Sequence, residues 1–402
     1  MMEWMTGILV CMFALLGYIY LGYPAALWIA SRVSRRKPPQ TSGESVPKVS
    51  LIITAHNEEQ AIASKVANVR GLDFPMERLE VILASDGSTD RTVARFERMM
   101  EDWARAGGSP NWDSVALRSQ KGKSQAQNEA VEVARHEILV FTDAGAHFDP
   151  MALRSLAAAF SDPSVGCATG RSTYRPVHGS EAGTSEGLYW KYEVWLRGME
   201  NRLGILMMGS AWMLGLRRNL FKPLQPTEGD DWVLPLRTLQ AGFRVVQVDR
   251  ATVYDDVVRS SKGLFRTKVR IISKDYLSLW RNRHLLNPFR YGWNAIALLS
   301  HKFLRWWAFA AMLLAYTLSV SMHADRIGLW FFSGQTFFYA LAAAGALAES
   351  RQWNSPLILK LTSAPYHFCV VQAASAVGIW KACTGRAEAF WQPIREVGTA
   401  DA

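Results

Sequence analysis

Short apolar runs alternate with longer mixed segments through the first half of the chain. Residues 49–53 and 81–83 are apolar and rich in β-branched side chains, and a helix-like segment separates them. Strands that alternate with helices are typical of an α/β domain built on a mostly parallel sheet. We therefore expect an α/β domain over residues 48–260, in which 137–141 form a further strand and 151–160 the helix after it.

A long apolar run opens the chain. Residues 5–30 exceed the roughly 20 residues that cross a bilayer as a helix. Basic residues follow the run, and Glu3 precedes it, which is the reverse of the charge order in a cleavable signal peptide. Under the positive-inside rule we expect a retained anchor over residues 1–37, with the N-terminus outside and the following domain in the cytoplasm. Two prolines and a glycine make residues 37–45 a tether.

Residues 261–300 interleave Lys, Arg, Tyr and Trp with Leu and Ile. This composition is typical of helices that lie in the membrane interface, and an ordinary surface helix is the alternative. We expect interfacial amphipathic helices over this segment.

Three more apolar runs lie within residues 301–385, where we expect transmembrane helices before a tail over 386–402. The first two, near 303–322 and 327–347, are each long enough to span a bilayer. The third, near 357–381, contains Lys360, Pro365 and His367, which favours a kinked or re-entrant segment. Four full spans place both termini outside, whereas a re-entrant third run leaves the C-terminus inside.

Composition narrows the classes of ligand. The formal charge of +10 suits phosphate-bearing ligands or anionic lipid, and 16 Trp residues suit membrane interfaces or sugar-stacking surfaces. Ordinary juxtamembrane charges explain the same excess. The four cysteines are scattered without a Cys-x-x-Cys pair, so we predict neither a zinc site nor a disulfide framework. No feature indicates a nucleic-acid partner.

Polar residues follow both strands of the predicted βαβ unit: His-Asn-Glu at 56–58 and Asp-Gly-Ser at 86–88. In an open parallel sheet, ligands bind at the carboxyl ends of the strands. An isolated Asp-Gly pair favours a tight turn. The two strand ends together predict one ligand site.

The stretches Thr-Ala-His-Asn-Glu at 54–58 and Ser-Asp-Gly-Ser-Thr-Asp at 85–90 resemble the opening of the family 2 glycosyltransferases. The resemblance implies a nucleotide-sugar-binding domain of GT-A type, and it runs from about residue 49 to residue 270. It implies that Thr54, Ala55, Glu58 and Asp86 contact the nucleotide sugar.

The stretch 121–128, Lys-Gly-Lys-Ser-Gln-Ala-Gln-Asn, is not a P-loop, because Leu117 stands where the first glycine is required and no strand runs directly into it. It resembles the Gly-Lys-x-x-Ala-x-Asn stretch of the family, which precedes a helix. The resemblance implies that Lys123 faces the nucleotide sugar; a solvated basic turn is the alternative.

The stretch 141–147, Phe-Thr-Asp-Ala-Gly-Ala-His, stands where the family carries Asp-x-Asp. The resemblance implies a divalent cation, Mg²⁺ or Mn²⁺, that bridges the two donor phosphates. Asp143 matches the first acid and is the implied metal ligand. Gly145 replaces the second acid, so the residues themselves supply one obvious carboxylate.

The stretch 227–237, Thr-Glu-Gly-Asp-Asp-Trp-Val-Leu-Pro-Leu-Arg, resembles the Glu-Asp motif of the family and leads to a Gly-aromatic turn. Asp230 falls on the glutamate of that motif and Asp231 on its catalytic aspartate. The resemblance implies that Asp231 is the general base for the acceptor hydroxyl. Acidic residues also cap helices, which is the alternative reading of a lone Asp.

Arg270 matches the arginine of the Gln-x-x-Arg-Trp motif of processive members, where it would stabilise the leaving diphosphate. A basic helix face against anionic lipid is the alternative. Thr267 and Ile271 replace the glutamine and the tryptophan, so one support for processive polymerisation is absent. Asp230 and three further residues are expected on the acceptor side: Trp190, Gly209 and Ser210. For Trp190, an aromatic helix that docks on the membrane or the core is an equally good explanation.

The resemblance implies an inverting glycosyltransferase of the bacterial-type inner or plasma membrane. It would move a sugar from a nucleotide donor, UDP-linked, to a growing glycan in extracellular or cell-envelope polysaccharide synthesis. Membrane lipid and export or synthase subunits are its expected partners. Transfer of one sugar to a lipid-linked acceptor is an alternative, and a catalytically silent nucleotide- or glycan-binding partner of a synthase is another.

Overall fold

The computed structural model describes residues 2–34, 46–174, 185–255, 261–351, 353 and 355–387, without the side chains of 174, 185–190, 261 and 356. The tether predicted over 37–45 and most of the tail predicted over 386–402 lie outside the described residues. The chain divides into two compact units. We call them the sheet unit, with residues 46–174 and 200–255, and the helical unit, with residues 2–33, 185–199 and 261–387.

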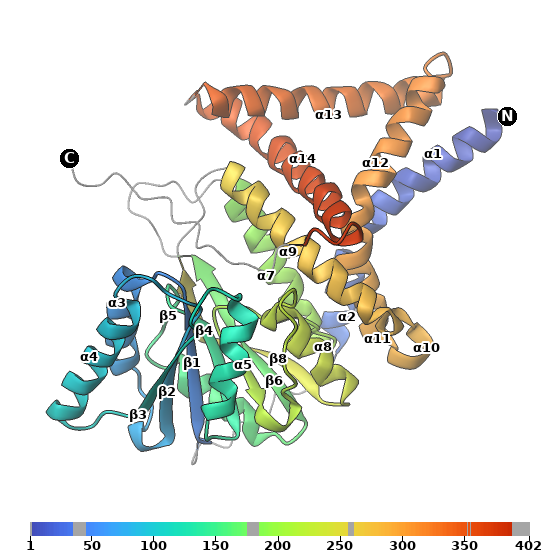
Figure 1. The fold of residues 1–402 in the computed structure, drawn as a ribbon. Coiled ribbons are helices and arrows are strands. Elements are labelled where there is room, and N and C mark those ends of the chain that lie inside the picture. The colour runs from blue at the N-terminus through green and yellow to red at the C-terminus, as the bar shows by residue number, and fades with distance from the viewer. Residues whose placement is uncertain are drawn as a thin grey trace. The chain divides into compact units, whose positions relative to one another are not determined.

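The sheet unit is built on an eight-stranded sheet of order β3-β2-β1-β4-β7-β6-β8-β5 (Figure 1). Its strands are β1 Val49–Ala55, β2 Leu79–Ser85, β3 Asn111–Ala116, β4 Ile138–Asp143, β5 His147–Phe148, β6 Val165–Tyr174, β7 Leu214–Arg217 and β8 Arg244–Asp255. The four strands from β3 to β4 run parallel, and β7 lies antiparallel between β4 and β6. The sheet fits the predicted α/β fold, which is mostly parallel on the side that carries the first strands.

Helices cover both faces of this sheet. They are α3 Glu59–Arg70, α4 Thr92–Ala106, α5 Lys123–Val133, α6 Ala152–Ala158 and α8 Asp230–Gln240. Apolar residues of α3, α4 and α6 form one core cluster with every second residue of the parallel strands. Alternate strand residues such as Ile52 and Ile82 are also fully buried but stand outside that cluster, and α5 contacts β1, β2 and β3. Burial on both faces explains why these strands read as continuous apolar runs.

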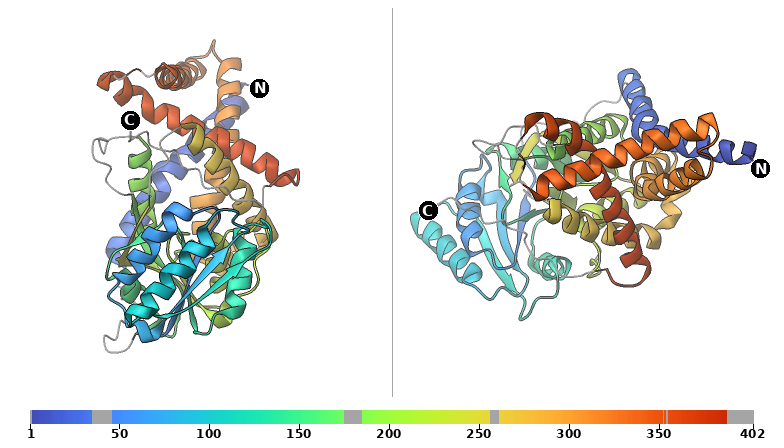
Figure 2. Two further views of the ribbon diagram at one scale, coloured as in Figure 1. Left: turned by 60° about the vertical axis from the view of Figure 1, so that its left-hand side comes forward. Right: turned by 90° about the horizontal axis from the view of Figure 1, so that it is seen from above.

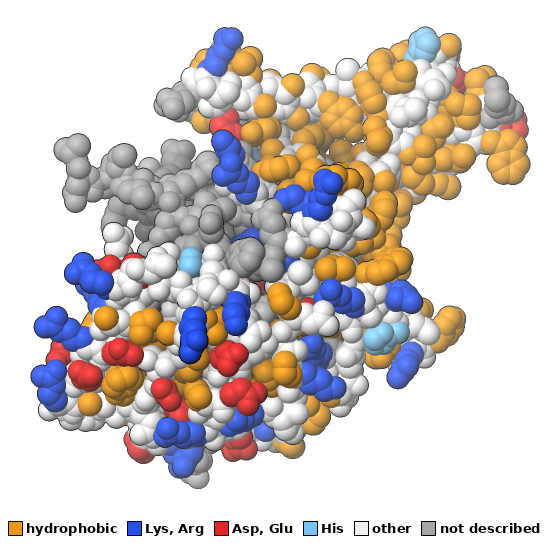
Figure 3. Space-filling view, viewed as in Figure 1, with side chains coloured by type: hydrophobic (Ala, Val, Ile, Leu, Met, Phe, Trp, Pro, Cys, Tyr) orange, Lys and Arg blue, Asp and Glu red, His pale blue; other side chains and the backbone are white. Residues whose placement is uncertain are grey.

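The helical unit contains the long helices of the C-terminal part of the chain (Figure 2). Its elements include α1 Met2–Gly17, a π-helical turn Tyr18–Gly22, α2 Tyr23–Val33, the residues up to 199 of α7 Ser185–Leu203, α9 Ser261–Arg281, α10 Pro288–Tyr291, α11 Trp293–Leu298, a second π-helical turn Leu299–Phe303, α12 Leu304–Ser321, α13 Arg326–Ser350 and α14 Pro356–Cys383. Within the described residues, three continuous helical runs are long and apolar enough to cross a membrane: Met2–Val33, Trp293–Ser321 and Arg326–Ser350. Apolar side chains such as Trp330 and Phe337 cover much of their surface (Figure 3).

The third apolar run of the C-terminal half forms one helix, α14, that continues through Pro365. Gly378 of α14 allows a close approach to α9, because a Cβ at this position would lie 3.0 Å from Ile272. Whether α14 spans fully or re-enters stays a prediction. In the segment expected at the interface, the exposed side chains include Trp280, Phe289 and Trp293. The interfacial position of this segment stays a prediction.

A buried ion cluster lies inside the helical unit. Glu193 on α7 accepts hydrogen bonds from His301 at 2.9 Å, Lys302 at 3.2 Å and Arg305 at 3.0 Å. Burial alone would raise the pKa of Glu193, but the three basic groups outweigh burial and hold this pKa well below its usual range. The ion cluster therefore ties α7 to the start of α12.

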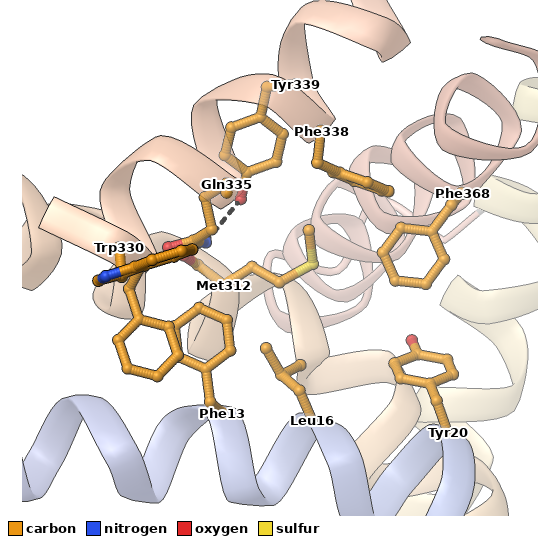
Figure 4. A pocket seen from close by; sticks show the side chains of 11 residues that line it. Phe13, Leu16, Tyr20, Met312, Trp330, Gln335, Phe338, Tyr339 and Phe368 are labelled. Carbon is orange, nitrogen blue, oxygen red and sulfur yellow. Dashed lines mark hydrogen bonds between the residues drawn. The ribbon is translucent and has the colours of Figure 1, made fainter. Parts of the chain in front are cut away.

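The helical unit also contains a pocket of about 270 Å³ between α1, α12, α13 and α14 (Figure 4). Aromatic side chains dominate its wall, and Gln335 donates to the hydroxyl of Tyr339 at 3.2 Å on one side. Gly334 also lines the pocket, and a Cβ added there would meet nothing within 4 Å.

Candidate active site

The carboxyl ends of β1 and β2 lie side by side, because the two strands pair in parallel with Ala55 opposite Ser85. His56 donates from Nδ1 to the carbonyl of Asp86 at 2.6 Å. The side-chain oxygen of Asn57, which has a left-handed φ of 53°, accepts from the backbone N–H of Thr89 at 2.8 Å. The two strand ends are thus joined into one structure, as the sequence predicts.

Three residues predicted to contact the nucleotide sugar lie in the last part of β1 or just after it: Thr54, Ala55 and Glu58. Thr54 and Ala55 are buried, and Thr54 lies opposite Asp143 in the register with β4. Glu58 is buried before the first turn of α3, and its backbone N–H donates to Thr92 at 2.8 Å. These residues lie at the carboxyl end of β1, but the contact of each side chain with the nucleotide stays a prediction.

Asp86 is fully buried and holds the loop that precedes α5. One carboxylate oxygen accepts from the backbone N–H of Lys121 at 2.7 Å, and both accept from that of Gly122, at 2.9 and 3.0 Å. Gly87 permits the close approach of this loop, because a Cβ there would lie 2.3 Å from the backbone of Ser119. Asp86 therefore organises the start of α5 as well as the end of β2.

Lys123 is the first residue of α5, and it binds two acids from distant parts of the chain. Its Nζ lies 2.8 Å from Oδ1 of Asp143, at the end of β4, and 3.2 Å from Oδ1 of Asp230, at the start of α8. Burial alone would lower the pKa of Lys123, but the two carboxylates outweigh it and raise this pKa above its usual value. The group is thus an ammonium ion throughout the physiological range.

Helix α8 is docked on α5 by polar contacts that the sequence did not reveal. Gln127 donates to Oδ2 of Asp230 at 2.9 Å, and Ser124 donates to the carbonyl of Glu228 at 2.6 Å. Glu228 in turn pairs with Arg237 at 2.9 Å. Gln127 occupies an unspecified position of the predicted motif, so the only signal for it was a polar residue on the helix face that carries Lys123.

Asp231, the predicted base, follows Asp230 in the first turn of α8 and is half-buried. Acids in a first turn also stabilise the helix dipole, so position alone does not separate the two roles. The carbonyl of Asp231 accepts a hydrogen bond from the backbone N–H of Gly209 at 2.7 Å. The structure therefore joins one predicted acceptor-side residue to the predicted base.

The remaining predicted site residues are Ser210 and Trp190, expected on the acceptor side, and Arg270, expected at the leaving diphosphate. Ser210 is buried, and its hydroxyl lies 2.5 Å from that of Ser172. Trp190 lies on α7 in the helical unit, in the part of that helix without described side chains. Arg270 lies half-buried on α9, also in the helical unit. The roles predicted for these three residues stay predictions.

The donor set at Asp143 fits a divalent cation only in part. The described residues contain no group of three or more His, Cys, Asp and Glu side chains that could hold a metal ion. Mg²⁺ at phosphate sites commonly takes one or two carboxylates and completes its shell with phosphate oxygens and water. Asp143 thus fits as a protein ligand of a cation that arrives with a diphosphate.

The sheet unit thus combines a run of parallel strands with an acidic strand end at Asp143 and a lysine at the start of α5. Residues 50–224 match the family described as glycosyl transferase family 2. The match covers 175 of the 402 residues of the chain. The match ends before Asp230 and Asp231, so it does not test the predicted base.

Curated relatives cover the chain in part. An N-acetylglucosaminyltransferase of Mesorhizobium japonicum is 25% identical over 283 residues, which are 66% of this chain and 64% of the relative. A beta-monoglucosyldiacylglycerol synthase of Synechocystis sp. is 30% identical over 148 residues, 35% of this chain and 29% of the relative. A poly-beta-1,6-N-acetyl-D-glucosamine synthase of Staphylococcus aureus is 26% identical over 145 residues, 36% of this chain and 33% of the relative. The chain thus spans just under two thirds of the first relative and about a third of the others.

A solved structure is similar over almost the whole length of both chains. The mannosyltransferase PcManGT of Pyrobaculum calidifontis, solved with GDP-Man and Mn²⁺, has a TM-score of 0.67 and 20% identity. The similarity covers 95% of this chain and 99% of that one. It confirms the predicted fold class.

Proposed function

We propose that this protein transfers a sugar, with inversion at the anomeric carbon, from a UDP-linked donor to a growing glycan at the membrane. The observation that carries the proposal is the position of Lys123 between Asp143 and Asp230, directly after the loop held by Asp86. Lysine at a helix N-terminus suits a diphosphate, because the ammonium and the helix dipole both favour negative charge.

The residues divide the reaction between them. Asp231 takes the proton from the acceptor hydroxyl as that oxygen attacks the anomeric carbon. The bond from the anomeric carbon to the diphosphate breaks in the same step, and Lys123 stabilises the charge that the leaving group gains. A divalent cation held by Asp143 and the donor phosphates would supply further charge compensation.

The names of two relatives favour N-acetylglucosamine as the transferred sugar, and one of them favours a polysaccharide product. The Synechocystis relative is named for a diacylglycerol glycolipid, which favours a lipid acceptor instead. Product length separates the two. Labelled UDP-N-acetylglucosamine should yield a ladder of chains in the first case and one extended lipid in the second.

Asp231→Asn tests the function in the full chain, purified in lipid nanodiscs. We expect the release of UDP from the donor to fall at least about 100-fold, because general base catalysis contributes that much. Thermal stabilisation by UDP should persist. Asp102→Asn on α4, where the side chain is exposed, is the control and should release UDP at the wild-type rate. Equal release by wild type and Asp231→Asn would remove the assigned base. UDP stabilisation without turnover of any donor would support the silent partner.

We also propose that the three apolar helical runs cross the membrane and that the sheet unit faces the cytoplasm. The basic residues after the first run support this orientation under the positive-inside rule. A cysteine placed at the exposed Lys121 should react with an impermeant thiol reagent only after the cells are permeabilised. Equal labelling of intact and permeabilised cells would show that the sheet unit faces the outside.

A further inference from the structure

Lys65 is fully buried, and the reaction proposed for Asp231, Lys123 and Asp143 does not use it. It lies on α3 between Ile62 and Val69, which are core residues on one helix face. A lysine on an apolar stripe is unusual, since burying a charge is unfavourable unless hydrogen bonds and opposite charges compensate it. Its Nζ lies 4.1 Å from the centre of the Phe148 ring, which satisfies one side of the ammonium.

The hydrogen bonds of Lys65 go to the segment that carries Asp143. Nζ donates to the hydroxyl of Thr142 at 2.9 Å and to the carbonyl of Ala146 at 2.6 Å. Asp143 lies between these two acceptors in the chain. The hydroxyl of Thr142 in turn donates to the carbonyl of Trp212 at 2.8 Å, so a chain of hydrogen bonds runs from Lys65 to Trp212.

Two neighbours of Lys65 on α3 hold the residues that follow. The hydroxyl of Ser64 lies 2.6 Å from Nε2 of His147. Asn68 donates to the carbonyl of Phe148 at 2.8 Å and accepts from its N–H at 2.8 Å. Helix α3 therefore fixes residues 142–148 by side-chain contacts at both ends, and Lys65 provides the contacts that flank Asp143.

We propose that Lys65 is a positioning residue, which holds the loop of residues 142–146 so that Asp143 faces Lys123 and the donor diphosphate. This inference rests on the proposed function. The loop needs an internal anchor because Gly145, at the place of the second acid, has no side chain with which to fix it. Lys65 reaches the loop from inside the sheet unit, so it acts on the donor only through Asp143.

Lys65→Met in the full chain tests the role, because methionine keeps a long unbranched stem and removes the three donors. We expect kcat for UDP release to fall at least about tenfold, since small displacements of a catalytic group are costly. The KM for the UDP-sugar should stay within threefold, because Asp86 and the loop before α5 are intact. Hydrogen exchange should become faster in residues 142–148 and stay unchanged in residues 123–133.

Val66→Ala is the matched control, since Val66 is the buried neighbour of Lys65 on α3 and its loss weakens the same core. It should lower the melting temperature while kcat stays within twofold of the wild type. A common loss of kcat in both variants would show that Lys65 acts through stability alone, and would overturn the inference. A wild type without turnover would instead refute the proposed function.

Thr142→Val tests the same contact by a smaller change in the core. It removes the hydroxyl that Lys65 reaches while the side-chain volume is nearly unchanged, so kcat should fall in the same direction. The double variant should be no more than twofold slower than Lys65→Met, because both changes break one coupled chain of contacts. If the fold-loss of kcat in the double variant equals the product of the two single losses, positioning through Thr142 is refuted. If Lys65→Met fails to fold, a wild-type kcat and wild-type exchange at 142–148 in Thr142→Val would also overturn the inference.

Discussion

The backbone N–H of Gly209 donates a 2.7 Å hydrogen bond to the carbonyl oxygen of Asp231. In an uninterrupted helix that carbonyl would accept from the residue four positions later, which is Pro235. Proline has no N–H, so it leaves the carbonyl of Asp231 available to a partner outside the helix. A proline inside α8 thereby links the segment that begins at Gly209 to the proposed base.

Pro235→Ala tests this link. Alanine restores an N–H that competes with Gly209 for the carbonyl of Asp231, so we expect kcat for UDP release to fall roughly three- to tenfold through loss of orientation. The melting temperature should not fall, because an interior proline is unfavourable for a helix. Pro226→Ala, at an exposed proline of the same segment, should leave kcat unchanged. A Pro235→Ala variant with wild-type kcat would show that the hydrogen bond has no catalytic role.

Lys123→Met should abolish most of the activity and destabilise the sheet unit. It leaves the carboxylates of Asp143 and Asp230 close together without their common cation. Removal of one partner of a buried ion pair typically costs about 3–5 kcal/mol. We expect UDP release to fall by at least about 100-fold, with a lower melting temperature in calorimetry. Lys121→Met removes an exposed charge two residues away and is the control. Comparable losses in both variants would point to net charge and not to the ion pairs of Lys123 with Asp143 and Asp230.

Gly87→Ala should disrupt the loop held by Asp86. The added Cβ would lie 2.3 Å from the backbone of Ser119, and backbone atoms cannot yield as a side chain end can. Gly107→Ala is a matched control, because Gly107 also has a positive φ but open space around its Cβ position. Both variants bear a backbone strain of about 1 kcal/mol, and we expect a further loss of about 2 kcal/mol and of UDP binding in Gly87→Ala only. Thermal unfolding with and without UDP measures both; equal behaviour of the variants would contradict the close approach.

The pattern of the sequence predicted the strands that carry the site, because apolar runs that end in polar residues mark the edge where ligands bind. It therefore predicted one ligand site for Asp86 and the residues after β1, whereas Lys123 and Asp143 were assigned by the resemblance to the family. The structure extends β1 by two residues beyond the predicted 49–53, and the helix predicted over 151–160 is α6 followed by a 3₁₀ turn, Ala159–Ser161. Element ends depend on tertiary contacts, which periodicity does not contain.

The contacts between motifs could not be predicted in the same way. Gln127 and Asp230 are far apart in the chain, and their hydrogen bond depends on how α5 and α8 pack. Lys65 did carry a signal, since a lysine at a position that should be apolar breaks the 3.6-residue pattern of α3. The pattern marks such a residue as buried, but it does not say which loop lies above it.

The pocket in the helical unit makes a different prediction. Gly334→Leu places a side chain into the space that Figure 4 shows between α1, α12 and α13. Gly7→Leu on α1 is the control, since Gly7 also has open space at its Cβ but does not line the pocket. Both changes should gain up to about 1 kcal/mol from helix propensity. In nanodiscs, Gly334→Leu should raise the melting temperature further than Gly7→Leu, because its side chain fills a void. An equal or smaller rise would mean that the pocket is already filled.

The stability of the protein should depend on pH through Lys65. Burial lowers the pKa of Lys65 to about 7, although Asp143 and Asp255 oppose the shift. The pKa of a lysine in the unfolded chain lies near its ordinary value of 10.5, so between these values the unfolded state binds more protons than the folded state. Stability should therefore rise with pH above about 7, with an upper limit of about 1.4 kcal/mol per pH unit. Denaturant unfolding at pH 7.0 and 8.5 measures the slope. Lys65→Met should lose this part of the slope, whereas Val66→Ala should keep it; an unchanged slope in Lys65→Met would show that another group titrates in this range.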